Sequence, residues 1–264
     1  MRAAAVLATG AAAAWAAPAL APVVPGVAAA LRVPTRCAVP GAVAITFDDG
    51  PHPQGTPAVL AALAAADARA TFFLVGEQVR RDPGLAAEVA AAGHAVAVHG
   101  DRHRNLLRVG PRGLEDDLAR AAATIAGATG AVPVLHRAPY GIYSPLALRA
   151  VRARRWTPLL WSRWGRDWTR RATPASVART VAGTLAAGDV LLLHDADDYS
   201  APGCWRATAG ALPRVLDAIA AAGLSPVPLA GAADVTHAPG RSTAGRTSGS
   251  RRPSRSPASG RGAP

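Results

Sequence analysis

Lysine is absent from this sequence of 264 residues, in which all 29 basic side chains are arginine. Alanine, glycine and proline are abundant, and with the missing lysine they indicate the coding bias of a GC-rich genome rather than a functional adaptation. Half of the residues are apolar but only 5% are aromatic, and alanine buries little area per residue. The composition still permits a sizeable core, and the length fits one large domain or two small ones.

Cysteine is also scarce, with Cys37 and Cys204 as the only two. Two cysteines allow at most one disulfide, which an exported chain would permit. Cys37 precedes the first predicted strand and Cys204 lies in a late loop, so the sequence leaves this bond open. Neither cysteine is a candidate catalytic residue or metal ligand.

Acidic residues are outnumbered, which gives a net charge of +12. Such an excess can indicate nucleic-acid binding, but its distribution argues against that function. Six arginines and no acid lie between Arg241 and the C-terminus, among Ser, Gly, Pro and Thr. This composition predicts a disordered tail. Its arginines are better suited to contact with anionic cell-wall polymer or lipid headgroups than with nucleic acid.

Charged residues are missing between Ala3 and Leu31. Residues 3–16 resemble the apolar region of a signal peptide, with Ala14-Trp15-Ala16 as the cleavage site. Alternatively, the whole stretch to Leu31 is long enough to remain as a membrane anchor, although its three prolines disfavour a straight span. An alanine-rich disordered leader is the third interpretation. Both main interpretations predict a secreted or membrane-anchored, extracytoplasmic protein.

Short apolar runs alternate with longer Ala/Leu/Arg-rich segments between residues 41 and 230. The runs lack polar alternation, as expected for parallel strands that are buried on both faces. They span residues 42–47, 70–75, 94–98, 132–136, 158–161, 189–193 and 224–228. Helices are predicted over residues 56–67, 77–92, 112–129, 144–154, 174–187 and 205–222. Thr173 before Pro174 is a typical helix start. The alternation predicts an α/β fold, with an open sheet and a closed barrel both possible.

Polar residues follow several of these strands, where the loops of a parallel α/β fold gather. Asp48 and Asp49 end the first strand, and by themselves they are typical of a turn. His99 and His103 follow the third strand at a spacing of four residues, which suits imidazole ligation of a divalent metal. Asp49 with both histidines would form a site of two histidines and one carboxylate, as hydrolytic metal chemistry requires.

Three later strands end in polar clusters too. They are His136 to Gly141, Trp164 to Trp168, and Leu192 to Asp195. Each cluster alone has an ordinary structural explanation, such as an ion pair or a packed tryptophan. Five successive clusters would require five coincidences, because the predicted fold brings them together.

These clusters resemble the motifs of carbohydrate esterase family 4, the NodB-homology polysaccharide deacetylases. The resemblance covers residues 41–230 and has five motifs in the family's order. They are Thr46-Phe47-Asp48-Asp49-Gly50, His99-x-x-x-His103, Arg137-x-Pro139-Tyr140-Gly141, Asp167-Trp168 and Leu192-Leu193-His194-Asp195. The resemblance implies a deformed (β/α) barrel of about seven parallel strands, within a deacetylase domain over residues 37–232. Residues 1–36 would then be signal peptide or anchor and linker, and residues 233–264 the disordered tail.

The resemblance also implies a role for each matched residue. Asp49, His99 and His103 would bind a divalent metal, usually zinc, with cobalt, manganese or nickel as alternatives. Asp48 would be the general base that deprotonates the attacking water, held ionised by Arg137. His194 would be the general acid, its pKa raised by Asp167. The backbone N–H of Tyr140 would stabilise the oxyanion, while Trp168 and Leu192 would line the pocket for the acetyl methyl group.

One motif departs from the family pattern. Gly100 and Arg104 stand where Ser or Thr and Pro usually follow the two histidines, so the usual hydroxyl support of this loop is missing. Asp101 is a candidate replacement.

The implied reaction is metal-dependent removal of N-acetyl groups from a polysaccharide such as peptidoglycan or a chitin-like glycan. An acetylated envelope or extracellular polysaccharide would be the partner, with O-acetyl esters also possible. We expect a monomer, with membrane association through the N-terminus and no nucleic-acid partner. The alternatives are a non-sugar amide hydrolase of the same fold and a catalytically silent carbohydrate-binding module.

Overall fold

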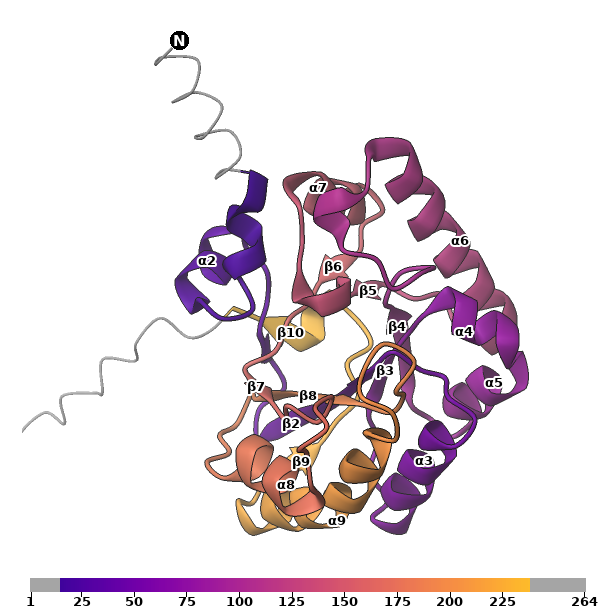
Figure 1. The fold of residues 1–264 in the computed structure, drawn as a ribbon. Coiled ribbons are helices and arrows are strands. Elements are labelled where there is room, and N and C mark those ends of the chain that lie inside the picture. The colour runs from indigo at the N-terminus through magenta and orange to yellow at the C-terminus, as the bar shows by residue number, and fades with distance from the viewer. Residues whose placement is uncertain (1–14, 238–264) are drawn as a thin grey trace, which may run out of the picture.

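Seven parallel strands form the centre of the structure, a computed structural model that describes residues 15–237. Their order is β6-β5-β4-β3-β2-β8-β7, and β9 pairs with the start of β2. The sheet curls into a deformed barrel with helices outside it (Figure 1), which confirms the predicted fold. The strands are β2 Ala42–Asp48, β3 Thr71–Leu74, β4 Ala95–Val98, β5 Leu135–His136, β6 Thr157–Pro158, β7 Arg163–Trp164, β8 Val190–His194 and β9 Ser225–Pro226.

A helix occupies each of the six predicted helical regions. The region 77–92 was predicted as one helix and is two, because Pro83 begins a second helix that Asp82 caps by accepting the N–H of Leu85 at 2.9 Å. The helices are α3 Gly55–Ala65, α4 Gly76–Arg81, α5 Pro83–Ala91, α6 Pro111–Thr129, α7 Pro145–Ala153, α8 Pro174–Ala182 and α9 Trp205–Ala221.

Helix α8 begins as its sequence predicts. Thr173 Oγ1 accepts the N–H of Ser176 at 3.1 Å, and Ser176 Oγ accepts the N–H of Thr173 at 2.9 Å. This reciprocal pair is a capping box ahead of Pro174. The helix ends at Ala182, five residues before the predicted limit of 187, so the segment before β8 is a loop.

Side chains of the central strands alternate between two hydrophobic clusters. On β2, Ala42 and Ala44 belong to the cluster inside the barrel, whereas Val43, Ile45 and Phe47 belong to the cluster beneath the outer helices. Because the side-chain period of a strand is two, Asp48 falls on the inner face. The same alternation on β8 assigns its last residue, His194, to the inside. The pleat thus points both residues into the barrel.

Two strand predictions were wrong in position. The run 132–136 pairs only through Leu135–His136, because it leaves helix α6 as an exposed loop in which Val132 is 79% accessible. The run 158–161 is a strand only at its start. The chain then crosses the open side of the barrel and pairs with β8 as β7, which lies in a segment predicted as a loop.

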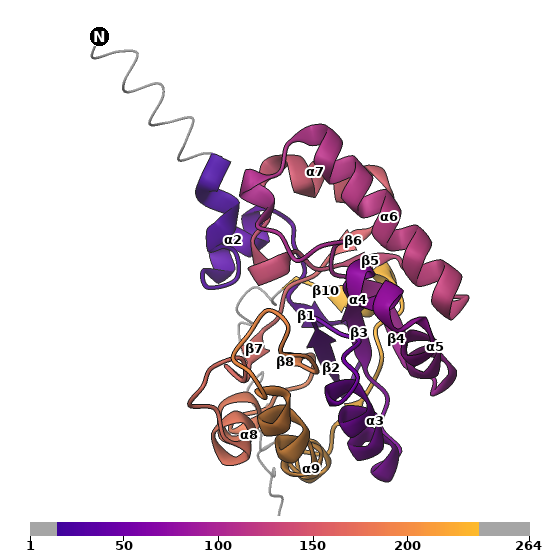
Figure 2. The same ribbon diagram turned by 45° about the vertical axis from the view of Figure 1, so that its right-hand side comes forward.

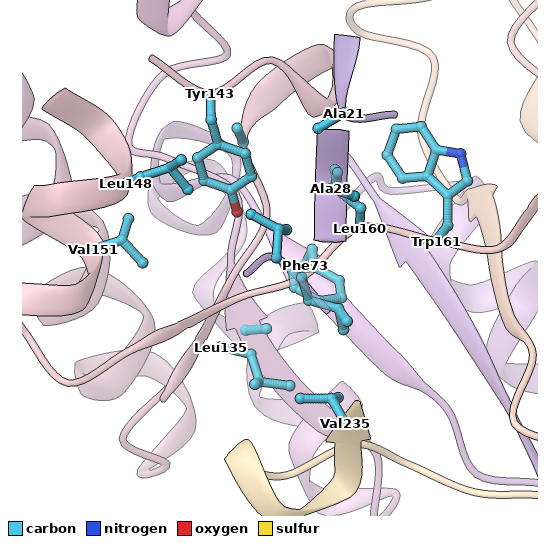
Figure 3. Packing of buried hydrophobic residues seen from close by; sticks show 14 of the residues in the cluster. Ala21, Ala28, Phe73, Leu135, Tyr143, Leu148, Val151, Leu160, Trp161 and Val235 are labelled. Atoms are coloured by element: carbon cyan, nitrogen blue, oxygen red, sulfur yellow. The ribbon is translucent and has the colours of Figure 1, made fainter. Parts of the chain in front are cut away.

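Residues 15–36 pack against the barrel. They include the 3-10 helix η1 (Ala17–Leu20), helix α2 (Pro25–Ala30) and strand β1 (Arg36–Cys37). Figures 1 and 2 both show α2 beside the barrel between α7 and β7. Ala21 and Ala28 are 3% and 2% exposed and join the inner cluster near Leu160 and Trp161 (Figure 3). No helix within residues 15–237 is long and apolar enough to cross a bilayer.

Residues 232–236 are placed against the same side of the domain. The 3-10 helix η4 (Ala232–Asp234) leads into β10 (Val235–Thr236), which pairs antiparallel with β1. Residues 3–14 of the predicted signal peptide and residues 238–264 of the predicted tail lie outside the described part of the chain.

Cys37 and Cys204 are both buried free thiols. Cys37 belongs to β1, whereas Cys204 precedes helix α9. The structure therefore contains no disulfide between them, which answers the question that the sequence left open.

Candidate active site

Asp49, His99 and His103 converge at the carboxyl end of the barrel. Each offers one ligand atom, and these atoms lie within 4.8 Å of one another. Asp49 Oδ1 is 3.4 Å from His99 Nε2 and 3.3 Å from His103 Nε2. This carboxylate oxygen is buried and has no hydrogen-bond partner. A buried unpaired carboxylate oxygen facing two imidazole nitrogens is costly without a cation, so the donor set fits a divalent metal.

The two histidines of this cluster are held differently. His99 Nδ1 lies 2.9 Å from the carbonyl oxygen of Arg137, so Nδ1 carries the proton and the Nε2 lone pair faces Asp49. His103 Nδ1 is buried without a hydrogen-bond partner. Its ring instead lies between the rings of Tyr199 and Tyr140.

Charge and burial set the protonation states that a metal site needs. Burial alone would raise the pKa of Asp49, but His99, His194 and His103 outweigh it and lower this pKa to about 2. Burial lowers the pKa of His103 to about 4 in spite of the neighbouring Asp49. At neutral pH the site therefore has an ionised carboxylate and a neutral imidazole, the forms that bind metal.

Asp48 is adjacent to this cluster and is held by Arg137. The guanidinium Nη1 donates to Asp48 Oδ1 at 2.7 Å and to Thr46 Oγ1 at 2.8 Å. Arg137 is fully buried, and its other nitrogens donate to the carbonyls of Leu159 and Leu160. These bonds fix the orientation of the Arg137 guanidinium. Arg137 therefore both positions Asp48 and compensates the negative charge of the Asp48 carboxylate.

His194 is adjacent to Asp48 on the neighbouring strand, since the two residues are register partners of β8 and β2. The Asp167 carboxylate bonds His194 twice, with Oδ1 3.0 Å from Nδ1 and Oδ2 2.6 Å from the backbone nitrogen. Thr208 on α9 donates to the same Oδ2 at 2.6 Å. Burial alone would lower the pKa of His194, but Asp167 overrides burial and raises this pKa to about 10. His194 is therefore an imidazolium at neutral pH.

A cleft of about 360 Å³ opens above these groups. Trp161, Trp164, Trp168 and Leu192 form its apolar wall, and Trp168 packs edge-on against His194 with ring centroids 5.5 Å apart. Tyr140 also lines the cleft, 54% exposed, in the left-handed backbone region at φ 61°. Left-handed backbone at a residue with a side chain costs energy and often marks a functional turn.

The structure brings the sequence-predicted site residues together. Eight of them line the cleft: Asp48, Asp49, His99, His103, Tyr140, Trp168, Leu192 and His194. Arg137 and Asp167 lie behind it, fully buried, and act through Asp48 and His194. The Asp101 carboxylate is buried and pairs with Arg80 of α4 at 2.5 Å. It therefore ties the loop to α4 rather than bonding a histidine ring, and its supporting role stays a prediction.

The sequence analysis missed three residues of this site. Thr208 and Tyr199 lie outside the matched motifs, and Trp161 was predicted as part of a strand. Trp164 was named only as the first residue of a polar cluster, without a role. Only their proximity to a motif hinted at a role, because an isolated Thr in a helix or Tyr in a loop has no distinguishing pattern.

Comparison with known proteins agrees with this geometry. The polysaccharide deacetylase family model matches residues 35–157. A chitooligosaccharide deacetylase of Sinorhizobium fredii is 38% identical over 154 residues, which are 58% of this chain and 71% of that protein.

Solved structures share the fold. A peptidoglycan N-acetylglucosamine deacetylase superposes with a TM-score of 0.69 at 26% identity, over 74% of this chain and 89% of its own. A family 4 carbohydrate esterase from Streptomyces lividans, in complex with acetate, superposes with a TM-score of 0.64 at 30% identity, over 72% and 92%. Sequence, fold and site thus agree, and the chain belongs to the polysaccharide deacetylase family of hydrolases.

Proposed function

We propose that this protein removes N-acetyl groups from an extracytoplasmic polysaccharide in a metal-dependent hydrolysis that releases acetate. One observation carries the proposal. A carboxylate fixed by a buried arginine and an imidazolium fixed by a buried carboxylate occupy paired positions on adjacent strands, beside three converging metal-ligand atoms. Amide hydrolysis needs an activated water, carbonyl polarisation and a proton donor for nitrogen, and these groups can supply all three.

Asp49, His99 and His103 would hold the metal, which we take to be zinc. When bound, a divalent cation there polarises the acetyl carbonyl and acidifies the attacking water. Asp48 accepts the proton of that water. Its Oδ1 is occupied by Arg137 at 2.7 Å, which leaves Oδ2 as the atom that takes the proton.

His194 donates a proton to the leaving amine. Its Nδ1 is bonded to Asp167, so Nε2 is the nitrogen that delivers the proton into the cleft. Asp167 keeps this ring charged and oriented, which an amine leaving group requires because expulsion without protonation is slow.

The cleft has complementary positions for the remaining parts of the acetyl group. The backbone N–H of Tyr140, in its left-handed turn, would donate to the developing oxyanion. Trp168 and Leu192 offer an apolar surface for the methyl group beside His194. In this arrangement every group predicted from the sequence has one task.

The substrate is inferred from the family. This chain resembles chitooligosaccharide and peptidoglycan N-acetylglucosamine deacetylases, which are named for N-acetylated glycans. We propose a glycan of this type, such as peptidoglycan, outside the cytoplasm. Support comes from the apolar residues 3–16 and from η1, which begins at Ala17 and packs on the domain. Residues 17–31 contribute to the core, which favours a leader or anchor that ends near Ala16.

Acetate release tests this proposal. The metal-loaded protein is assayed on glycol chitin, GlcNAc oligomers, peptidoglycan and acetylated xylan, before and after chelation, and with zinc, cobalt, manganese or nickel restored. We expect acetate from an N-acetylated glycan, loss after chelation and recovery with metal. If the metal-loaded protein binds a glycan without releasing acetate, the carbohydrate-binding alternative is correct. Hydrolysis of simple amides alone would favour the non-sugar hydrolase.

A further inference from the structure

We propose that Tyr199 is a positioning residue for the proposed metal ligand His103, which it holds by ring stacking in place of a hydrogen bond. This inference rests on the proposed metal site. The two histidines are held differently. His99 Nδ1 is bonded to a backbone carbonyl oxygen, whereas His103 Nδ1 is buried with no partner. Metal-binding histidines almost always have a hydrogen-bonded second nitrogen that orients the ring, so His103 needs another restraint.

Aromatic rings supply this restraint from two sides. The Tyr199 ring lies parallel to the His103 ring, with centroids 4.3 Å apart and an interplanar angle of 11°. The Tyr140 ring contacts His103 edge-on, with centroids 4.4 Å apart at 68°. A parallel ring covers one imidazole face and opposes tilting, while the perpendicular ring opposes rotation in the plane. His103 is 5% exposed between them, so its Nε2 is directed toward Asp49.

The Tyr199 ring is itself anchored at its hydroxyl. Tyr199 Oη donates to Glu77 Oε1 at 2.5 Å and accepts from Gln78 Nε2 at 3.0 Å. Gln78 is buried, and its Oε1 accepts from Arg81 at 2.9 Å. Both partners of the hydroxyl, and Arg81 as well, belong to α4, so the hydroxyl is tied to one short helix.

Helix α4 also holds the loop that carries His103. The N–H of Gly76 donates to the carbonyl of Gly100 at 2.9 Å, and the N–H of Glu77 donates to the carbonyl of Asp101 at 2.8 Å. The first turn of α4 therefore positions the backbone before His103, while the next groups of the same helix position the ring that stacks on it. A single element sets both the place and the tilt of this ligand.

The loop that carries Tyr199 is restrained at the two residues that precede it. Asp197 Oδ1 lies 3.1 Å from His52 Nε2, and Asp198 Oδ1 lies 3.2 Å from Arg81 Nη1. Because the loop is pinned at its neighbours, Tyr199 is not a mobile surface ring that happens to meet the histidine. The stack also accounts for the departure at Gly100, since a ligand oriented by rings does not depend on a hydroxyl at that position.

Metal affinity and metal geometry test the proposal directly. Zinc affinity of the full chain is measured by competition with a chromophoric chelator, and the visible spectrum of the cobalt-loaded protein reports ligand geometry. Tyr199→Leu fills the site without offering a ring face, and Tyr199→Met does the same should the leucine variant fail to fold. Tyr199→Phe keeps the face. Asp198→Asn is the matched control, because it loosens the same loop without touching His103.

We expect Tyr199→Leu or Tyr199→Met to weaken zinc binding by about 10- to 100-fold and to alter the cobalt spectrum. Tyr199→Phe should restore affinity to within about threefold of the parent, and Asp198→Asn should leave it unchanged. Parent-like affinity and spectrum in a folded leucine or methionine variant would overturn the proposal. So would an equal loss in Asp198→Asn, which would assign the effect to the loop. Failure of the unmodified protein to bind zinc would instead overturn the metal site of the proposed function.

Discussion

The carboxylate of Asp167 accepts two hydrogen bonds from the single residue His194, one from its ring at 3.0 Å and one from its backbone N–H at 2.6 Å. The two bonds couple the charge of the imidazole to its position. The ring cannot turn away from the cleft without breaking one bond, and it cannot lose its proton without losing the attraction of the carboxylate. This pair makes His194 a proton donor at neutral pH.

Replacing Asp167 by Asn should therefore move the alkaline limit of activity. The pKa of His194 is raised to about 10, with Asp167 as the main raising cause. The proton donor is present below that pH and is lost as pH rises through it. Without the carboxylate charge the pKa falls, so the alkaline limb of kcat/KM should shift toward neutral pH. The pH profile of acetate release measures this shift.

Thr208→Val is the matched control for this experiment. It removes the hydrogen bond of Thr208 to Asp167 but leaves the carboxylate charge beside His194. The alkaline limb should stay near its original position, with a smaller loss of rate. An unmoved limb in Asp167→Asn would contradict the assignment of His194 as the acid.

Substitutions of two histidines should separate metal binding from proton donation. His99→Ala removes one of three converging ligands and should abolish metal binding and activity together. His194→Ala should bind metal normally but slow turnover by about 10²- to 10⁴-fold, the usual contribution of a general acid. Metal content and single-turnover rates distinguish the two variants. Full turnover by His194→Ala would show that another group protonates the amine.

The sequence predicted the reacting groups because each follows a strand. Asp48 and His194 end predominantly apolar runs, and a parallel α/β fold collects such ends on one side. The alternation that separates Val43 from Ala44 then explains why these two residues point inward. The sequence motifs and the two-residue period of the strands were together sufficient to predict the polar residues at the centre of the site.

The remaining parts could not be predicted, because their signals are tertiary. Tyr199 acts through a stack on a residue 96 positions earlier in the chain, and no local pattern marks it. Strand β7 has two residues in the sheet, too few for a periodic signal. The proline-rich residues 17–31 have the composition of an exported leader, yet Ala21 and Ala28 are core residues. Apolar composition alone cannot separate these outcomes.

Acid should destabilise the fold through buried neutral histidines. Burial lowers the pKa of His136 to about 3 and that of His94 to about 4, against about 6.5 in the unfolded chain. Between these values the unfolded state binds more protons, so stability falls as pH drops below about 6.5. Each group contributes a slope of about 1.4 kcal/mol per pH unit.

Denaturant unfolding of the metal-free protein between pH 7 and pH 4 measures this slope. His94→Asn removes one titrating group, and its slope should be shallower by about one proton. Salt should change the slope little, since burial rather than charge repulsion is the main cause of both shifts. An identical slope in His94→Asn would show that this imidazole is not neutral in the folded state.

The N-terminal segment should behave as part of the catalytic domain. Ala28 on α2 is 2% exposed in the inner cluster, whereas Val23, five residues earlier, is 59% exposed. Ala28→Asp would bury an unpaired carboxylate and should lower the free energy of unfolding by about 2–4 kcal/mol. Val23→Asp introduces the same group into solvent and should cost no more than about 0.5 kcal/mol. Denaturant midpoints of the two variants, made in the full chain, give both values.

Equal and small losses would mean that α2 does not pack on the barrel in solution. A large loss confined to Ala28→Asp would mean that a leader or anchor must end before η1, because a bilayer span that used residues 17–31 would remove Ala21 and Ala28 from the core.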